Sequence, residues 1–493
     1  MGEYKTKHIG VIGSGFSGLA AACTLAQKGY KVTVLEKNIK AGGRGRSFSE
    51  KGFTFDMGPS WYWMPEIMEN FFQSFGKSTR DYYQLQRLDP GYRVFLKDNA
   101  IDISANFEKI KQLFESIETG AGQALERFLN EAENKYNTGM GKFVIKPSHS
   151  ILEFAEWDLL KALFQIQLFT DMRSHLKSYF KNPILLQLLE FPVLFLGAQP
   201  SKTPALYSLM NHADLKLGTW YPMGGMARIP EAMIELALSL GVEIQTDQNV
   251  KGFEFEGDSI SAIQTNTQTL KVDGVVASAD YHHVEQNLLP KKFRQYDEAY
   301  WSSRTMSPSS LIFYVGLDAK IPGLEHHNLF FESSFDKHAE EIYVNPQWPT
   351  QPLFYLCCPS KTDDSVAPEN HENLFFLIPV APDMTSAENL RDHYWKMLCE
   401  AVKRRTGIDI EPHVVYKRSF AHEEFVSEYN SYKGNAYGLA NTLQQTAFLK
   451  PKMKSAKLNN LFYAGQLTVP GPGMPPGIIS GQLAANEIAK IIQ

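Results

Sequence analysis

The stretch Lys7–Glu36 reads KHIGVIGSGFSGLAAACTLAQKGYKVTVLE. Short β-branched apolar runs predict buried strands over His8–Ile12 and Lys31–Leu35. Between them, small and apolar residues at helical spacing predict a helix over Phe16–Lys28, and Gly29 is a natural helix stop. A strand, a glycine turn, a helix and a second strand form the first unit of a dinucleotide-binding fold. We therefore expect an α/β core with a parallel sheet around this stretch.

The turn has the pattern G-x-G-x-x-G, formed by Gly13, Gly15 and Gly18. The first glycine permits a tight turn, the second lets the backbone approach a pyrophosphate, and the third lets the helix pack close to the strand. We place Phe16 and Ser17, at the start of the helix, at the same site. Glu36 lies about twenty residues further on, where a carboxylate accepts a hydrogen bond from a ribose hydroxyl, and Lys37 follows it. An acid here disfavours a 2′-phosphate, so FAD and NAD remain open at this point.

The composition indicates an ordinary folded protein. The chain has 493 residues, 43% of them hydrophobic and 21% charged, enough for two or three packed units. A net charge of −5 provides no basic field, which excludes nucleic acid as the expected partner. The four cysteines are scattered, and no metal-ligand spacing occurs, so we predict reduced core cysteines and no metal site. No secretory signal is visible, and no apolar run is long enough to span a membrane.

Two loops follow Glu36. The first, AGGRGRS at 41–47, has glycines and arginines that can donate to phosphate, and we assign Gly43 and Arg44 to that role. The second, GFTFDMGPS at 52–60, ends in Gly58, Pro59 and Ser60. An aromatic cluster at 61–65 comes next, which is typical either of a core or of the wall of a large apolar pocket.

These motifs resemble the CrtI-type carotenoid (phytoene) desaturases, flavoproteins of the amine oxidase and GDP-dissociation-inhibitor fold group. The matching motifs are the glycine turn with Glu36, GGRGRS (42–47), FDMGPS (55–60) and the C-terminal segment 461–488. The resemblance implies FAD as the cofactor, a carotenoid as the substrate and a Rossmann-type FAD-binding domain assembled from discontinuous segments. FAD is also favoured because no second G-x-G-x-x-G follows a strand elsewhere in the chain.

The resemblance implies further cofactor contacts. A Gly-Gly-Met segment at 224–226 would pack near the flavin, and Val250 would meet the adenine through its backbone. The C-terminal segment, LFYAGQLTVPGPGMPPGIISGQLAANEI, would run along the ribityl chain and the isoalloxazine. Its expected contacts are Gly465, Gln466, Pro475 and Ile478. Many flavoproteins have an acid where Gln466 stands, but an amide also hydrogen-bonds a hydroxyl.

Two inserts interrupt the FAD-binding domain, which we assign to 1–95, 218–290 and 420–493. Residues 96–217 form a predicted helical insert, since 107–137 and 151–180 carry apolar residues at helical spacing.

The apolar segment 184–196 in this insert is too short to span a bilayer. A buried core helix and a membrane-facing helix are both consistent with it, and a carotenoid substrate favours the membrane.

Residues 291–419 form the second insert, a β-rich substrate-binding domain. Four apolar runs with Pro, Gly and Asp punctuation predict an antiparallel sheet. They are 310–318, 328–333, 352–358 and 373–381.

The expected reaction is hydride transfer from an allylic carbon of a C40 isoprenoid to the flavin, most simply from phytoene to lycopene or a partial series. The alternatives are a 1-hydroxycarotenoid 3,4-desaturase, another carotenoid desaturase or isomerase, or, in a different class, a non-catalytic isoprenoid-binding protein. The catalytic acid or base is unknown. His212, His326 and His327 lie near predicted pockets, but the sequence assigns them no partner.

We expect oxygen or a quinone as the electron acceptor. Because a carotenoid is a lipid, we also expect a cytoplasmic protein that is peripherally associated with the cytoplasmic membrane.

Overall fold

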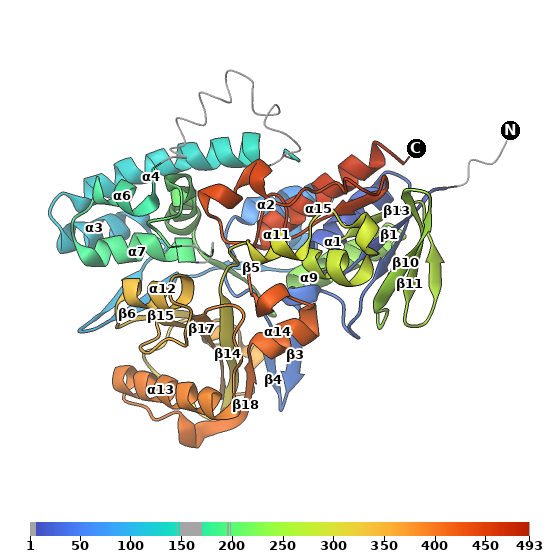
Figure 1. Ribbon diagram of the computed structural model, residues 1–493. Coiled ribbons are helices and arrows are strands. Elements are labelled where there is room, and N and C mark those ends of the chain that lie inside the picture. The colour runs from blue at the N-terminus through green and yellow to red at the C-terminus, as the bar shows by residue number, and fades with distance from the viewer. Residues whose placement is uncertain (1–5, 145, 148–169, 195–196, 198, 493) are drawn as a thin grey trace.

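The computed structural model describes residues 6–144, 146–147, 170–194, 197 and 199–492. Figure 1 shows a parallel sheet built around the start of the chain on the right, a mixed sheet at the lower left, and a layer of helices above the mixed sheet. The fold is therefore a mixed α/β fold, as predicted.

A five-stranded parallel sheet is built on the Lys7–Glu36 stretch. Its strand order is β19-β13-β1-β2-β9, and every neighbouring pair is parallel. The strands are β1 (His8–Ile12), β2 (Lys31–Leu35), β9 (Glu243–Gln245), β13 (Gly274–Ala277) and β19 (Leu461–Tyr463). The predicted bounds of the first two strands are confirmed. Because the sheet takes strands from three distant parts of the sequence, its assembly is discontinuous, as predicted.

Helices α1 (Phe16–Gln27), α9 (Arg228–Ser239) and α15 (Met474–Ala489) pack with this sheet. The small residues of α1 allow unusually close packing, and most of the helix is buried. A Cβ atom added at Gly481 of α15 would lie 2.1 Å from the carbonyl oxygen of Ser17. The C-terminal helix is thus locked against the helix of the glycine turn.

An antiparallel meander lies beside the parallel sheet. It comprises β10 (Val250–Glu256), β11 (Ser259–Thr265) and β12 (Thr269–Lys271). The next strand, β13, leaves the meander and pairs with β1. The reason is that β13, GVVA, is buried at every position, as parallel strands usually are.

A seven-stranded sheet has the order β18-β14-β17-β16-β15-β6-β7. The strands are β6 (Tyr92–Leu96), β7 (Ala100–Ile103), β14 (Ser309–Leu317), β15 (His327–Phe331), β16 (Phe354–Cys357), β17 (Glu372–Val380) and β18 (Val414–Phe420).

The antiparallel sheet predicted from the runs at 310–318, 328–333, 352–358 and 373–381 is confirmed, because β14, β17, β16 and β15 pair antiparallel in this order. The β6–β7 hairpin extends this sheet, and β6 pairs with β15 in parallel. The predicted domain boundary between residues 95 and 96 falls within this hairpin, and the predicted domains on its two sides stay predictions. The hairpin joins the sheet here because it pairs the backbone groups of β15 that would otherwise form an open edge. The other predicted domain boundaries stay predictions.

The two faces of the seven-stranded sheet pack against different partners. Leu311 and Phe313 of β14 lie in one core cluster with Trp395 of helix α13 (Glu388–Thr406). Ile312 and Tyr314 lie in a second cluster, shared with the helical layer. This alternation places every second residue of β14 and β17 toward the interior between sheet and helices.

The helical layer contains α3 (Phe107–Ile117), α4 (Ala121–Thr138), α6 (Met172–Lys177), α7 (Pro183–Leu194) and α8 (Leu209–His212). The helix predicted over 107–137 is two helices, because Gly120 adopts a left-handed conformation with φ of 84° between them. Most of the helix predicted over 151–180 lies outside the described residues.

Within the apolar segment, residues 184–194 lie in α7, and the side chains of Leu185, Leu189 and Phe191 are buried. The core interpretation of this segment is therefore confirmed, and a membrane-facing role for it is not supported. Among the described residues, no helix is both long enough and apolar enough to span a bilayer.

The remaining short elements connect these layers. The helices are α2 (Pro65–Gln73), α10 (Tyr281–His283), α11 (Glu298–Ser302), α12 (Phe335–Tyr343) and α14 (His422–Tyr429). The strands are β3 (Ser47–Glu50), β4 (Phe53–Asp56), β5 (Leu85–Arg87) and β8 (Trp220–Pro222).

Candidate functional site

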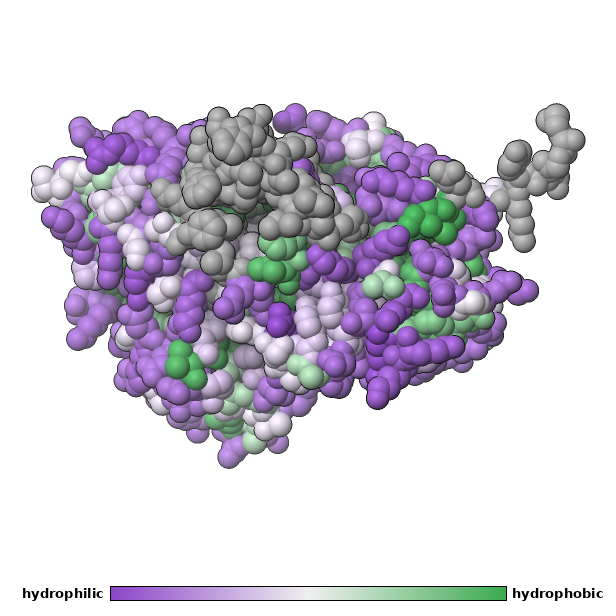
Figure 2. Space-filling model, turned by 45° about the horizontal axis from the view of Figure 1, so that its top comes forward, coloured by the Kyte–Doolittle hydropathy of each residue, from purple (hydrophilic) through white to green (hydrophobic). Residues whose placement is uncertain are grey.

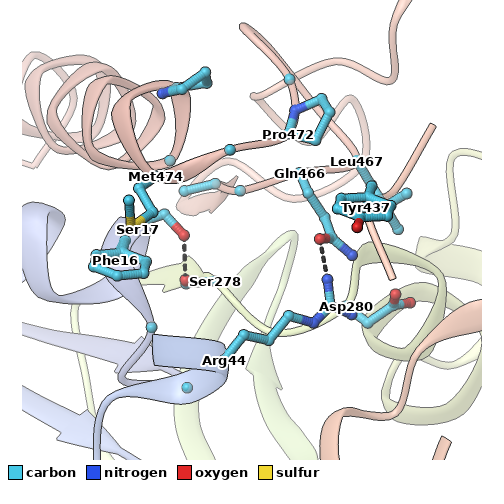
Figure 3. Close-up of a pocket in the computed structure, with 18 of the residues that line it drawn as sticks. Phe16, Ser17, Arg44, Ser278, Asp280, Tyr437, Gln466, Leu467, Pro472 and Met474 are labelled. Carbon is cyan, nitrogen blue, oxygen red and sulfur yellow. Dashed lines mark hydrogen bonds between the residues drawn. The ribbon is translucent and has the colours of Figure 1, made fainter. Parts of the chain in front are cut away.

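A cavity of about 1080 Å³ is lined by residues of both sheets and of the helical layer. One end is formed by the carboxyl ends of β1, β2 and β13 of the parallel sheet, the position at which open α/β sheets bind ligands. The other end is lined by the mixed sheet and the helical layer. Figure 3 shows part of the wall between the glycine turn and the C-terminal segment.

The glycine turn opens into this cavity. A Cβ atom added at Gly15 would contact nothing within 4 Å, whereas one at Gly18 would lie 2.0 Å from the carbonyl oxygen of Gly13. No side chain caps the start of α1, so its first N–H groups are available to an anion. These positions fit the three roles predicted for the glycines.

The Glu36 carboxylate is buried and held by its neighbours. Its Oε2 accepts hydrogen bonds from the Ser14 amide at 3.0 Å and the Ser14 hydroxyl at 2.6 Å. Its Oε1 accepts from the Asn38 amide at 2.9 Å. Ser14 and Asn38 were not predicted as site residues, although both neighbour predicted ones. This network orients the carboxylate at the end of β2, where a ribose would lie.

Arg44 reaches across the cavity to the C-terminal segment (Figure 3). Its guanidinium donates to the side-chain oxygen of Gln466, to the Ser431 hydroxyl and, at 2.9 Å, to the Ala436 carbonyl. Burial lowers the pKa of Arg44, while nearby Tyr429 and Asp280 act to raise it. The structure therefore brings together two predicted residues 422 positions apart. Phosphate contact by Arg44 stays a prediction.

The end of β13 supplies further wall residues that the sequence analysis did not assign to the site. The Ser278 hydroxyl lies 2.6 Å from that of Ser17 (Figure 3). Burial raises the pKa of Asp280 to about 6, although the amides of His283 and Tyr432 donate to it. Their location in the sequence could have identified them, because Ser278–Asp280 directly follows a buried parallel strand, where α/β sheets bind ligands.

Most predicted cofactor-binding residues line the cavity. They are Gly13, Gly15, Phe16, Ser17, Glu36, Lys37, Gly43, Arg44, Gly58, Pro59, Ser60, Val250, Gly465, Gln466 and Pro475. Gly18 and Ile478 are not among the lining residues, and Ile478 is fully buried in the core shared by α1 and α15. Gly18 and Ile478 therefore support the residues that line the cavity. Contact between FAD and the lining residues stays a prediction.

The far end of the cavity is mainly apolar. The aromatic cluster contributes Trp61 and Trp63, and the mixed sheet contributes Ile312 and Leu377. The helical layer adds Leu206, Leu209 and Met210. The aromatic cluster at 61–65 is thus both a pocket wall and part of a core, so both interpretations of its sequence hold.

The three histidines singled out by the sequence lie outside the cavity wall. His212, His326 and His327 are all buried, and burial lowers the pKa of each. The pKa of His326 falls to about 3. None of them lines the large cavity, so none acts directly on a ligand bound in it.

Comparison with known proteins identifies the family. The family model described as flavin containing amine oxidoreductase matches residues 16–489. The chain belongs to this family. It is therefore a flavin-dependent oxidoreductase, and FAD is its cofactor, as predicted.

Curated relatives of this flavoprotein include carotenoid desaturases. It is 41% identical over 494 residues to a carotenoid 3,4-desaturase of Haloarcula japonica, with 100% of both chains covered. It is 28% identical to a zeta-carotene-forming phytoene desaturase of Myxococcus xanthus, over 98% of this chain and 94% of the relative.

Solved structures confirm the fold. Cyclohexylamine oxidase of Brevibacterium oxydans superimposes with a TM-score of 0.59 at 14% identity, covering 99% of both chains.

Proposed function

We propose that this flavoprotein is a carotenoid 3,4-desaturase that removes hydrogen from adjacent carbons of an acyclic carotenoid. The observation that carries the proposal is one continuous cavity with a dinucleotide-binding end and an apolar end. The chain is 41% identical to a carotenoid 3,4-desaturase and 28% identical to a phytoene desaturase, which supports placing the 3,4-desaturase before the phytoene desaturase. The sequence analysis had placed phytoene first and the 3,4-desaturase second.

The chain's residues fit FAD at the dinucleotide end. Gly15 leaves open space, the start of α1 presents uncapped amides, and Glu36 offers an oriented carboxylate. The start of α15 also lines the cavity without a side-chain cap. Bound FAD would supply the acceptor for the hydride that leaves one carbon, while the adjacent carbon releases a proton.

The apolar end has to bind a substrate that lacks charge. Burial of a polyene against aromatic and aliphatic walls contributes about 25 cal/mol per Å² of apolar area. Trp61, Trp63 and Met210 provide such area and keep water from the reacting carbons. This end therefore holds and orients the chain of the carotenoid by shape rather than by hydrogen bonds.

We propose peripheral contact with a membrane, at the cytoplasmic face, as the source of the substrate. Leu449 lines the cavity and is 45% exposed, which supports an opening at this position. Figure 2 shows a mainly hydrophilic face with small separate hydrophobic patches, which is consistent with surface contact rather than deep insertion. Oxygen or a quinone is the proposed electron acceptor.

The test is expression in two hosts, one that accumulates phytoene and one that accumulates a 1-hydroxylated acyclic carotene. We expect a new 3,4 double bond in the second host and unchanged phytoene in the first. Conversion of phytoene alone would reject the 3,4-desaturase in favour of the phytoene desaturase.

Purified protein provides a second test. Its flavin absorbance should bleach under anaerobic conditions with the 1-hydroxylated acyclic carotene and stay unchanged with phytoene.

A further inference from the structure

Two histidines and a cysteine meet behind the aromatic wall of the cavity. One potential ligand atom from each of His326, His327 and Cys357 lies within 4.8 Å of the others, and all three residues are buried. His327 and Cys357 are directly opposite each other in the antiparallel pair β15–β16, and His326 immediately precedes β15. Strand register therefore builds the cluster, and the sequence has no local motif that would reveal it.

Both imidazoles are oriented by a hydrogen bond at Nδ1. The Nδ1 atom of His326 lies 2.7 Å from the Thr362 hydroxyl, and that of His327 lies 2.6 Å from the Tyr355 hydroxyl. With Nδ1–H as the donor, Nε2 carries a lone pair. Both Nε2 atoms are buried without a hydrogen-bond partner in the part of the chain that the structure describes. An imidazole held in this way is the usual form in which histidine binds a metal ion.

The rings are also locked by stacking. His327 lies parallel to Trp61, with ring centroids 4.2 Å apart, and His326 lies edge-on to Tyr221 at 4.6 Å. The Tyr355 hydroxyl also contacts the Cys357 thiol. It can therefore accept from His327 and donate to the cysteine sulfur at the same time. The orientation of both rings is therefore fixed before an ion binds.

A second, small cavity adjoins the cluster. It has a volume of about 20 Å³, and its lining includes His326, Cys357, Ser60 and Asp56. A volume of this size holds about one water molecule. The space is therefore sufficient for an ion or for a water molecule that completes its coordination.

We propose that His326 Nε2, His327 Nε2 and Cys357 Sγ bind a Zn²⁺-type transition-metal ion, with a water molecule as fourth ligand. Imidazole and thiolate together favour such ions over Mg²⁺ or Ca²⁺. The thiol proton is released as the metal–sulfur bond forms. Zinc bonds of about 2.0–2.3 Å place tetrahedral ligand atoms roughly 3.3–3.8 Å apart, so ligand atoms that lie up to 4.8 Å apart have to approach by up to about 1.5 Å.

The position of the ion gives it a structural role. None of its three ligands lines the large cavity, whereas Trp61 and Tyr355, which contact His327, do. The ion thus positions two residues of the substrate wall. It takes no electrons from the substrate, and the inference does not depend on which carotenoid is bound.

The first test is elemental analysis of the full-length FAD-loaded protein, purified without a metal-affinity column. We expect about one equivalent of zinc per chain, falling below about one tenth in Cys357→Ser and in His326→Gln. The matched control is Cys358→Ser. The neighbouring Cys358 lies in the opposite core, with its sulfur 3.5 Å from the Ser360 hydroxyl, so this variant should keep the metal.

The second test needs no variant to fold. Wild-type protein is stripped with a chelator and titrated with Co²⁺, and d–d bands at wavelengths beyond the flavin absorption are recorded. We expect tetrahedral bands that saturate at about one equivalent, with a higher thermal midpoint. Wild-type protein with neither zinc nor these bands would overturn the proposal. Equal metal content in wild type, Cys357→Ser and His326→Gln would overturn it too, because the ion would then lie elsewhere.

Discussion

The two ends of the cavity are built in different ways. The dinucleotide end depends on backbone geometry and a short-range network: Gly15, the start of α1, and Glu36 held by Ser14. The apolar end depends on side chains from the aromatic cluster, two strands of the mixed sheet and the helical layer. A diphosphate needs a few donors at fixed positions, whereas a polyene needs only apolar area of a suitable shape. Single substitutions at the dinucleotide end should therefore cause large losses of FAD binding, whereas single substitutions at the apolar end should cause smaller losses of carotenoid binding.

The largest expected effect is that of Gly15→Val. The φ of Gly15 is −72°, which valine adopts, and the added side chain would point into open cavity. The protein should fold, yet its affinity for FAD should fall at least about ten-fold, because the added side chain occupies the space of the pyrophosphate. Flavin absorbance after gel filtration and circular dichroism measure the two properties. Gly141→Val is the matched control and should keep FAD, because an added Cβ atom at Gly141 also contacts nothing within 4 Å and Gly141 does not line the cavity. Full occupancy in Gly15→Val would refute this placement of the cofactor.

Glu36→Ala should have the next largest effect. It removes the carboxylate that accepts from Ser14 and Asn38, and loss of these charged hydrogen bonds lowers stability by roughly 1–3 kcal/mol. FAD retention should fall about ten-fold as well. Equilibrium dialysis and urea unfolding test both effects.

Glu243→Ala is the control for this change. It lies on the neighbouring strand β9 and does not line the cavity, so FAD retention should not change. Equal loss of FAD in both variants would contradict the specific role of Glu36.

Leu377→Ala tests the apolar end. Leu377 pairs with Ile312 across β14 and β17, and both line the cavity. Removing about three buried carbon groups should lower kcat/KM for the carotenoid about ten-fold or more, with FAD retention unchanged. Ile378→Ala, which points to the opposite core, should lower stability by about 2–4 kcal/mol and leave kcat/KM intact. An equal loss of kcat/KM in both variants would contradict the role of Leu377 in binding the carotenoid, because Ile378 does not line the cavity.

The smallest effect at neutral pH is expected for Asp214→Asn. Burial raises the pKa of Asp214 to about 7, and the Tyr92 hydroxyl donates to it at 2.8 Å. The folded state therefore binds one more proton than the unfolded state from about pH 4 to about pH 7. Over this range the free energy of unfolding should fall as pH rises. The asparagine variant should show a shallower fall in urea unfolding; an unchanged slope would assign the pH dependence to other groups.

The elements that the sequence predicted well are those set by local patterns. The bounds of β1 and β2 were confirmed, and most of the predicted cofactor contacts line one cavity. The β6–β7 hairpin pairs with the edge of β15, more than two hundred residues later in the chain, and no local pattern predicts such a contact. Ser278 and Asp280 were missed because their role comes from the place of β13 next to β1.

The sequence by itself determined the dinucleotide unit, since a glycine turn and the periods of its strands and helix are properties of neighbouring residues. It also determined the family, through motifs at the two ends of the chain. Only the tertiary structure decided which side chains form the apolar wall and which buried groups meet behind it. His327 and Cys357 are 30 positions apart in the sequence, and strand register alone places them opposite each other. Register depends on packing across the whole sheet, which no local pattern contains.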